Sequence, residues 1–279
     1  MAHLEVRRGV RFDLFDKEAM ISLLVKALRS MCVDGVYLAL YKCLRYPFVQ
    51  LKSLRRRRRI FASTDPVEIF TSIYETNWWG SRESVSGKGS TLSYTENLRH
   101  ELPDLFRRFS VKTVFDAPCG DFNWMSKVVE SSEIRYVGGD IVPQLISNNM
   151  ATFVSERVEF MQFNIMNDEF PAADVWICRD CLIHFSYADI YRSLRNYIAS
   201  EIPYILATSH INVSGFLNRD ILTGDARLLD LCSFPFFFPV DARYRIKDWI
   251  KPHPSREMVL WDRAQVIQAI SKMKPALGL

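Results

Sequence analysis

The chain has 279 residues, of which 48% are hydrophobic and 24% charged. This composition is ordinary for a folded protein and excludes a disulfide-stapled chain, because six scattered cysteines make no disulfide framework. The net charge of +4 is uneven, since residues 1–60 carry 14 Lys and Arg against 5 Asp and Glu, and residues 61–279 carry 22 against 27. An acidic body of this kind argues against nucleic-acid binding over residues 61–279.

Residues 1–60 predict a basic helical arm that is separate from the rest of the chain. Two helix-compatible stretches, 17–30 and 36–51, mix apolar and basic residues and precede the polybasic run Arg55–Arg59. Neither contains the roughly 20 apolar residues that a membrane-spanning helix needs. The arm either packs on the body and ends in a solvated charge run, or contacts an anionic membrane surface; a nucleic-acid contact is a third interpretation. No secretory signal is evident, so we expect a cytoplasmic protein. The alternative is a protein attached peripherally to the inner membrane.

The second predicted domain, residues 61–279, opens with a lid segment over residues 61–110. Asp65-Pro66 can start a helix that runs to about Thr76, and a further helix is expected over 94–109. Between them lie the paired tryptophans of Asn77–Gly80 and the glycine- and serine-rich stretch 84–90. The stretch 84–90 predicts a flexible polar loop, and the tryptophans predict either a lid over a ligand ring or a packed aromatic hinge.

The stretch Asp116–Phe122 joins a β-type run, 112–116, to a plausible helix, 123–130. A strand, a tight turn at Gly120 and a helix N-terminus together suit a nucleoside ligand, because backbone N–H groups there lack partners and glycine permits a close approach. A second run, 134–140, ends in Asp140, 24 residues after Asp116. A carboxylate in this position can accept hydrogen bonds from both hydroxyls of a ribose.

Strand and helix patterns alternate along the rest of the chain, which indicates a parallel sheet with crossover helices. We expect helices at 144–155 and 186–199, the second capped by Ser186 and Asp189, and strands at 158–164, 173–180, 202–208 and 258–261. In open α/β sheets, ligands bind at the carboxyl ends of the strands. The polar residues expected at such ends are Asp116, Asp140, Asn164, Asp180 and Thr208.

The loop also separates two kinds of enzyme that share this architecture. A nicotinamide dehydrogenase needs Gly-x-Gly-x-x-Gly, and here only Gly120 is a glycine. An acid, a one-glycine turn and a second acid at the next strand end resemble the class I S-adenosylmethionine (SAM)-dependent methyltransferases, whose first motif is acid-x-Gly-x-Gly-x-Gly. Pro118 and Phe122 stand where the first and third of those glycines usually are. The resemblance implies an α/β fold with a seven-stranded, mostly parallel Rossmann-like sheet, helices on both faces, and SAM as the cofactor.

The resemblance also implies cofactor contacts from the loop, the strand ends and the lid segment, with Trp79 over the adenosine and Asn164 reading the adenine amino group. The predicted cofactor-binding residues are Trp79, Asp116, Ala117, Cys119, Gly120, Asp121, Trp124, Asp140, Ile141, Asn164, Ile165 and Arg179.

The predicted catalytic stretch is Asp180–His184, between the fourth strand and its helix, where the family holds its acceptor. Methyl transfer from a sulfonium is an in-line displacement, which needs positioning and, for a hydroxyl nucleophile, a base. His184 suits this role, because an unperturbed histidine has a pKa of about 6.5, and Asp180 is the second catalytic candidate. Alternatively, His184 caps the helix or bonds in the core, and Asp180 holds a turn. Cys178 and Cys181 form a lone CxxC without a fourth zinc ligand, so we expect no metal.

Residues 210–256 are too long for a simple connection and are expected to form an acceptor-side insertion. Within it, Asn218–Arg227 could hydrogen-bond a polyhydroxylated acceptor, and Phe234–Pro239 could wall the pocket or belong to the core. The Asn/Asp-Pro-Pro-Tyr/Phe signature of members that methylate planar amino groups is absent. We therefore expect O-methylation of a sugar, glycan or other small hydroxylated acceptor. The alternative is a catalytically inactive methyltransferase-like scaffold that docks on a membrane through the arm. The sequence carries no signal for an oligomeric state.

Overall fold

The computed structural model describes residues 57–278, and from Arg59 onward they belong to one compact unit. The expected helices of the basic arm, together with Arg55 and Arg56, lie outside the described residues. Arg59 is described, and its guanidinium pairs with Glu75 at 2.6 Å. Over residues 57–278, no helix combines the length and the apolar character that crossing a bilayer requires.

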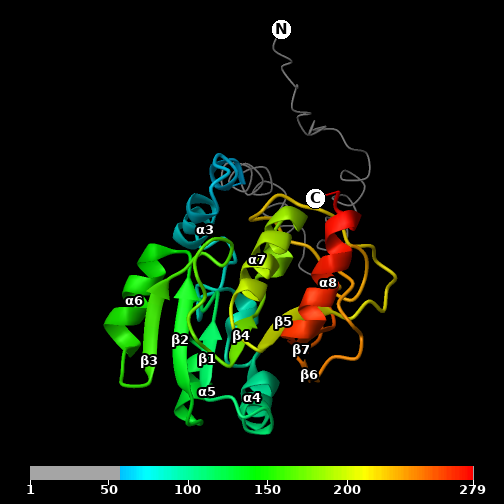
Figure 1. Ribbon diagram of the computed structural model, residues 1–279. Coiled ribbons are helices and arrows are strands. Elements are labelled where there is room, and N and C mark those ends of the chain that lie inside the picture. The colour runs from blue at the N-terminus through cyan, green and yellow to red at the C-terminus, as the bar shows by residue number, and fades with distance from the viewer. Residues whose placement is uncertain (1–56, 279) are drawn as a thin grey trace, which may run out of the picture. The chain divides into compact units, whose positions relative to one another are not determined.

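A seven-stranded sheet forms the centre of this unit, in the order β3-β2-β1-β4-β5-β7-β6 (Figure 1). The strands are β1 (Thr113–Asp116), β2 (Arg135–Asp140), β3 (Val158–Gln162), β4 (Val175–Cys178), β5 (Tyr204–His210), β6 (Tyr244–Lys247) and β7 (Arg256–Asp262). Strands β1 to β5 pair in parallel, whereas β7 runs antiparallel to both β5 and β6. The predicted seven-stranded, mostly parallel Rossmann-like sheet is confirmed.

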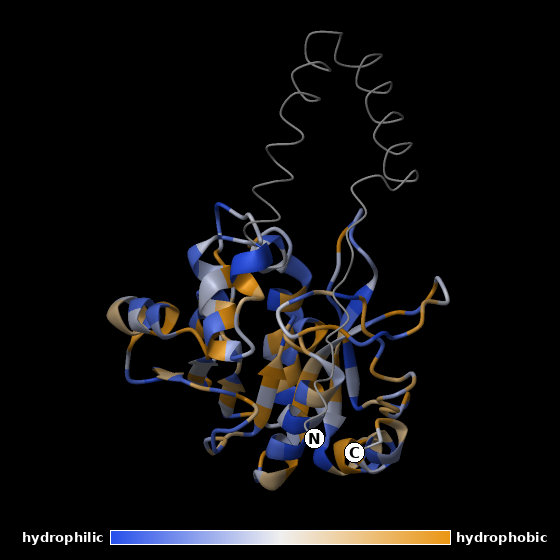
Figure 2. Cartoon of the chain, turned by 90° about the horizontal axis from the view of Figure 1, so that it is seen from above, coloured by the Kyte–Doolittle hydropathy of each residue, from blue (hydrophilic) through white to orange (hydrophobic). Residues whose placement is uncertain are grey.

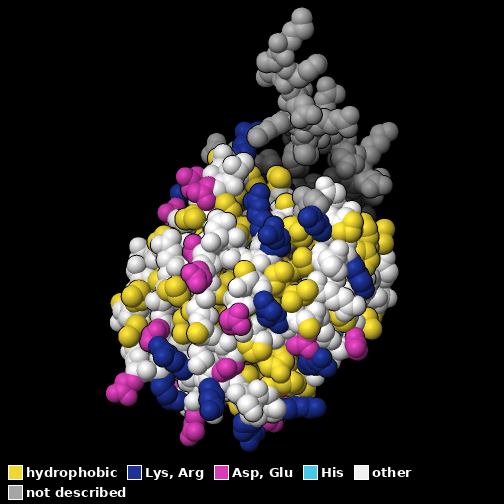
Figure 3. All heavy atoms as spheres, in the orientation of Figure 1, with side chains coloured by type: hydrophobic (Ala, Val, Ile, Leu, Met, Phe, Trp, Pro, Cys, Tyr) yellow, Lys and Arg dark blue, Asp and Glu magenta, His cyan; other side chains and the backbone are white. Residues whose placement is uncertain are grey.

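Helices cover both faces of the sheet, and hydrophobic residues dominate the strands between them (Figure 2). The helices are α3 (Pro66–Glu75), α4 (Glu96–Arg108), α5 (Met125–Glu130), α6 (Pro143–Phe153), α7 (Tyr187–Ala199) and α8 (Arg263–Ala276). Successive residues of a strand point to opposite faces. Phe115 of β1 accordingly packs with α7 and α8, whereas Val114 packs with α4 and α5. On the face shown in Figure 3, acidic and basic side chains of the described residues are interspersed.

Three of the helices, α3, α7 and α8, begin at a residue whose side chain accepts a hydrogen bond from an N–H group of the first turn. Asp65 accepts a hydrogen bond from the Val67 N–H at 2.9 Å, directly before Pro66. The predicted cap of α7 is confirmed, because Ser186 Oγ accepts from the Asp189 N–H at 3.1 Å. Helix α8, which the sequence analysis does not include, begins with a capping box between Asp262 and Gln265.

Two further differences from the predicted elements lie near the antiparallel edge of the sheet. Strand β6 falls inside the predicted insertion 210–256. Its four residues include one buried side chain, Ile246, and they are too few for their alternation of apolar and basic residues to indicate a strand. Strand β5 continues to His210, which places Thr208 inside the strand rather than at its end. Thr208 Oγ1 there accepts a hydrogen bond from the Asp180 N–H at 2.8 Å, so it supports the chain at Asp180.

Candidate active site

A cavity of about 360 Å³ lies at the carboxyl ends of β1, β2 and β4, beside the lid segment. This volume is within the range of small-molecule sites, roughly 300–1,000 Å³. All predicted site residues except Ala117 and Asp121 line it: Trp79, Asp116, Cys119, Gly120, Trp124, Asp140, Ile141, Asn164, Ile165, Arg179, Asp180 and His184.

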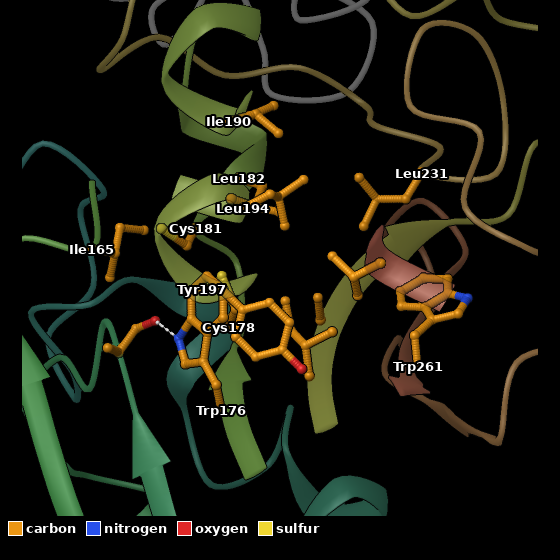
Figure 4. Packing of buried hydrophobic residues seen from close by; sticks show 14 of the residues in the cluster. Ile165, Trp176, Cys178, Cys181, Leu182, Ile190, Leu194, Tyr197, Leu231 and Trp261 are labelled. Atoms are coloured by element: carbon orange, nitrogen blue, oxygen red, sulfur yellow. Dashed lines mark hydrogen bonds between the residues drawn. The ribbon is translucent and has the colours of Figure 1, made fainter. Parts of the chain in front are cut away.

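Ala117 and Asp121, which were also predicted to contact the cofactor, do not line the cavity and make contacts within the protein. Ala117 is fully buried, and its carbonyl oxygen accepts from Trp176 Nε1 at 2.8 Å, the dashed line in Figure 4. The Asp121 carboxylate faces the lid segment, where it accepts from Ser84 Oγ at 3.0 Å, the Val85 N–H at 2.9 Å and Ser86 Oγ at 3.2 Å. These bonds fasten the lid segment to the loop.

The expected unpartnered N–H groups of the loop are absent from residues 119–122. The Cys119 N–H donates to the Gly139 carbonyl at 2.8 Å, and the Gly120 N–H donates to Asp140 Oδ2 at 3.1 Å. The N–H groups of Asp121 and Phe122 donate to Ser86 Oγ and the Cys119 carbonyl at 3.1 and 3.4 Å. The prediction of free backbone donors here is therefore wrong, and the loop instead orients the Asp140 carboxylate.

Left-handed backbone conformations at Gly120 and Phe122 shape this loop. Gly120 has φ 58°, and a Cβ there would lie 2.2 Å from Ser86 Oγ. Phe122, which stands where the family usually has a glycine, has φ 56°. Its ring is buried against Tyr136 and Phe160, with centroids 4.7 and 5.2 Å apart, and this burial offsets the conformational strain.

Changing Gly120 to alanine is expected to destabilise the protein by roughly 2–4 kcal/mol, from about 1–2 kcal/mol of left-handed strain plus overpacking against Ser86. Gly215→Ala is the matched control, because Gly215 has φ 69° but no atom of residues 57–278 lies within 4 Å of the added Cβ. Urea unfolding of both variants measures the difference. Equal losses of stability in the two variants would show that the contact with Ser86 contributes nothing.

Two buried carboxylates, Asp140 and Asp116, lie at the ends of β2 and β1 on the cavity wall. Asp140 Oδ1 accepts from the Val142 N–H at 3.0 Å, and burial raises the pKa of Asp140 to about 6. Asp116 Oδ2 accepts from the Tyr136 hydroxyl at 2.8 Å, and burial raises the pKa of Asp116 to about 7. Each carboxylate keeps lone pairs for further donors, since one oxygen accepts about two hydrogen bonds.

Asn164 and Ile165 follow β3 and line the same cavity. Asn164 Oδ1 accepts from the Met166 N–H at 3.0 Å, and the Asn164 N–H donates to Asp168 Oδ2 at 2.7 Å. The Asn164 side-chain amide N–H and the Ile165 backbone N–H have no acceptor among the described residues. The pair thus offers hydrogen-bond donors, and Asn164 Oδ1 keeps a second lone pair that can accept from the amino group expected there.

His184 ends the short 3₁₀ helix Leu182–His184 and lines the cavity beside Trp79, with ring centroids 5.5 Å apart. Its Nδ1 lies 2.8 Å from the Asp225 carbonyl oxygen. Because a carbonyl can only accept, Nδ1 carries the proton and Nε2 keeps the lone pair. Burial lowers the pKa of His184, which favours this neutral form. The alternative that His184 caps α7 is wrong, because Ser186 is the N-cap.

The segment 218–227, predicted to hold the acceptor, packs behind His184 and does not line the cavity. The Gly224 N–H donates to the His184 carbonyl at 2.8 Å, and Arg227 Nη1 donates to the Ile183 carbonyl at 3.0 Å. The aromatic stretch 234–239 does not line it either, since Phe236 and Phe238 are buried in the core. The segment 218–227 therefore supports the stretch Asp180–His184 from behind, and within the predicted insertion 210–256 His253 and Arg256 line the cavity.

A buried cluster of charges, partly missed by the sequence analysis, forms another part of the wall. Arg179 donates to both carboxylate oxygens of Asp248 at 3.0 and 2.9 Å, and to the Gly89 carbonyl at 2.7 Å. Arg256, at the start of β7, pairs through Nη1 with Asp180 Oδ1 at 2.7 Å. The Tyr94 ring lies 5.0 Å from the Arg256 guanidinium. Burial alone would raise the pKa of Asp180, but Arg256 and Arg179 lower it, so this carboxylate is ionised.

The lid segment is held in place by these and neighbouring contacts, in contrast to the flexible loop that its composition predicts. Besides the bonds from Asp121 and Arg179, Asn123 Nδ2 donates to the Ser90 carbonyl at 3.0 Å. Gly87 lets the chain pass Trp79, since a Cβ at Gly87 would lie 3.0 Å from that of Trp79. Trp79 thereby faces the cavity next to His184.

The CxxC pair belongs to the hydrophobic core. Cys178 and Cys181 are buried in the cluster that contains Trp176 and Tyr197 (Figure 4). Among residues 57–278, no three His, Cys, Asp or Glu side chains are grouped in a way that could hold a metal ion.

No protein-family model matches the sequence, and no curated protein matches it. Solved structures resemble its fold. A SAM-dependent methyltransferase of Leishmania major has a TM-score of 0.54 and 13% identity over 71% of this chain and 85% of its own. Magnesium protoporphyrin IX methyltransferase of Synechocystis PCC 6803 with bound S-adenosylhomocysteine (SAH) has a TM-score of 0.51 and 10% identity over 71% of this chain and 100% of its own.

Human N-acetylserotonin methyltransferase in complex with SAM has a TM-score of 0.50 and 13% identity over 68% of this chain. The match spans 57% of the human enzyme. These similarities, together with the strand order and the position of the cavity, establish the architecture: the chain has the fold of the class I SAM-dependent methyltransferases.

Proposed function

We propose that this protein is a SAM-dependent methyltransferase that methylates a hydroxyl group of a sugar, a glycan or another small hydroxylated molecule. The observation that carries the proposal is the shared cavity. It brings Asp140 and Asn164, which suit a nucleoside, together with His184, which suits a base. The fold supports the same assignment, because ligands of open α/β sheets bind at this edge.

The residues on the β1–β2–β3 side fit the adenosine part of SAM. Asp140 can accept from both ribose hydroxyls, and the Ile165 N–H and the Asn164 amide can donate to ring nitrogens of adenine. Trp79, in the lid segment, offers an aromatic face. When bound, SAM would supply a methyl group on a positively charged sulfur. Attack of a nucleophile on the methyl carbon would break the carbon–sulfur bond, and the sulfur would leave with the electron pair as SAH.

His184 fits the role of general base for a hydroxyl acceptor. The acceptor hydroxyl donates to Nε2, and its proton moves to Nε2 as the new C–O bond forms. The Nδ1–H bond to the Asp225 carbonyl holds the ring in the tautomer that this transfer needs. The negative charge of Asp180 favours the protonated ring that results, since Asp180 raises the pKa of His184 against the larger effect of burial.

Binding of SAH is expected to strengthen as the pH rises from 5 to 7. Ribose hydroxyls donate best to an ionised carboxylate, and burial raises the pKa of Asp140 to about 6. The fraction of protein molecules in which Asp140 is protonated, and must lose that proton when SAH binds, therefore falls between pH 5 and 7. Calorimetric titrations at several pH values measure the effect, with Asp140→Asn as the control that should remove this dependence. A dissociation constant independent of pH would contradict the role of Asp140.

Calorimetry with SAM, SAH and NAD⁺ tests the proposed function itself. We expect micromolar binding of SAM and SAH and no binding of NAD⁺, because the loop lacks the dinucleotide glycines. A SAH dissociation constant weaker than millimolar would favour the alternative, an inactive scaffold. Membrane contact through Arg55–Arg59 is a separate proposal, tested by cosedimentation with vesicles that contain or lack phosphatidylserine.

A further inference from the structure

Gly89, Asp180 and Arg256 converge at one corner of the cavity, and of these the proposed chemistry uses only the negative charge of Asp180. A Cβ added to Gly89 would lie 3.2 Å from Asp180 Oδ2 and 3.3 Å from Arg256 Nη2. Gly89, Asp180 and Arg256 all line the cavity. A side chain at position 89 would therefore press on a carboxylate oxygen and a guanidinium nitrogen, and glycine leaves both atoms free of that contact.

Both of these atoms retain hydrogen-bonding capacity. Among residues 57–278, Arg256 Nη2 is buried without a hydrogen-bond partner, although Nε donates to the Asp248 carbonyl at 2.8 Å and Nη1 contacts Asp180. Asp180 Oδ2 accepts no hydrogen bond from the described residues, and Arg179 Nη1 lies 3.6 Å from it, which is beyond hydrogen-bond distance. A buried N–H group without a partner is rare in proteins, so a ligand atom at this corner is the natural acceptor.

The charges of the cluster indicate which chemical group fits. Two guanidinium groups, Arg179 and Arg256, balance two carboxylates, Asp180 and Asp248. An anion would gain little net attraction here, and Asp180 Oδ2 would repel it. A cation would be repelled by Arg256 Nη2. A hydroxyl group can donate to the carboxylate and accept from the guanidinium at the same time.

The position of the corner assigns it to the acceptor rather than to the nucleoside. Arg256 begins β7, which pairs with β5, whereas Asp140 ends β2 on the other side of β1 and β4. With about 4.8 Å between neighbouring strands, the two backbone positions are about 19 Å apart across the sheet. Asp180 and His184 belong to the connection after β4, which lies between them.

We propose that Gly89, Asp180 Oδ2 and Arg256 Nη2 form a subsite for an uncharged hydroxyl of the acceptor, next to the hydroxyl that is methylated. The acceptor is then a diol or polyol, such as a neutral sugar, and not a monohydroxylated or acidic molecule. This inference rests on the proposed function and names its substrate class. It adds Arg256 and Gly89 as residues that determine specificity.

The test uses the full chain saturated with SAH and measures binding of small probes by saturation-transfer NMR. The probes are myo-inositol and the methyl glycosides of glucose, mannose and rhamnose, with methyl glucuronoside as the anion and 2-methoxytetrahydropyran as the ring without free hydroxyls.

Gly89→Ala is the central variant, because Gly89 has no left-handed φ and the added methyl fills the corner without backbone strain. Arg256→Lys removes the second guanidinium nitrogen and keeps the charge. Arg245→Lys on β6 is the matched control, since Arg245 pairs with Glu257 and does not line the cavity.

We expect at least one neutral polyol to bind the wild type, and Gly89→Ala and Arg256→Lys to weaken that binding at least tenfold while SAH affinity changes less than threefold. Arg245→Lys should change neither. The inference is overturned if no neutral polyol binds the SAH complex, if both central variants bind it as well as the wild type, or if the glucuronoside binds more tightly than the glucoside. Failure of SAH itself to bind the wild type would instead contradict the proposed function.

Discussion

Replacing His184 with glutamine is expected to lower kcat for methyl transfer to a neutral glycoside by roughly 10²–10⁴-fold, the usual contribution of a general base. Glutamine keeps a polar side chain of similar size but cannot take up the proton. Transfer of radiolabel from methyl-labelled SAM measures kcat, and calorimetry should show SAH affinity within threefold of wild type. His253→Gln is the matched control, because His253 also lines the cavity but stacks edge-on against Tyr94.

The pH profile separates a base from a residue that only shapes the cavity. Burial lowers the pKa of His184 below the ordinary value of about 6.5, and only the neutral ring accepts a proton. In the wild type kcat/KM should therefore rise with pH through this lowered pKa and be level by neutral pH. The His184→Gln variant should lack this rise. His184 is excluded as the base if the His184→Gln variant keeps kcat within threefold of the wild type. It is also excluded if kcat/KM of the variant shows the same rise with pH as the wild type.

Replacing Asp140 with alanine is expected to weaken SAH binding by about 100-fold or more. Two hydrogen bonds from ribose hydroxyls to a charged acceptor contribute about 1.5–3 kcal/mol each, and about 3 kcal/mol corresponds to more than a hundredfold change in affinity. Calorimetry measures the effect. Glu159→Gln is the matched control, because Glu159 is an exposed acid on the adjacent strand β3 that pairs with Arg135.

Asp140 also supports the loop, since Oδ2 accepts from the Gly120 N–H and Oδ1 from the Val142 N–H. Asp140→Asn retains one oxygen for these bonds, so comparison of the two variants separates lost ribose contacts from a disturbed loop. Thermal unfolding followed by circular dichroism shows whether each variant is folded. If both variants are folded and bind SAH as tightly as the wild type, the nucleoside does not lie at Asp140.

Most of the sheet could be predicted because its central parallel strands are buried on both faces, whereas the edge strand β3 alternates between buried and exposed residues. Strand β4, for example, is buried at all four positions, and this produces a short apolar run that differs from the helical pattern after it. Strand β6 has one buried residue, Ile246, and lies on the sheet edge, so its sequence has no such run. Helix α8 was not predicted, although its capping pair, Asp262 and Gln265, is present in the sequence.

The cofactor side of the site was more predictable than the acceptor side, for a topological reason. Acids at the ends of parallel strands, such as Asp116 and Asp140, fall at one edge whatever the helices between them contain. Arg256 reaches the same edge from the start of a strand, because β7 runs antiparallel to β5 and pairs Arg256 with His210. The rule that ligands bind at the carboxyl ends of strands does not select Arg256, which is at the start of its strand. No pattern in the sequence marks Tyr94 of the lid segment as a cavity residue either.

Hydrogen bonds between distant residues decided the rest of the site. The loop was expected to offer free N–H groups, yet Ser86 and Asp140 use two of them. Glycines and serines predicted a flexible lid, yet Asp121 fastens three consecutive lid residues from 35 to 37 positions away. The composition of a segment indicates only how that segment behaves by itself. It cannot indicate hydrogen-bond partners that come from other elements of the fold.

The sequence by itself determined the α/β class, the strand-end acids and the position of His184, because burial periodicity and strand-loop-helix order are local properties. Only the tertiary structure decided which polar groups remain available inside the cavity. Arg179 is occupied by Asp248, 69 positions away, and the carbonyl of Asp225 sets the tautomer of His184 from 41 positions away. The physical reason is that a buried polar group must find a partner, and only the folded chain brings those partners together.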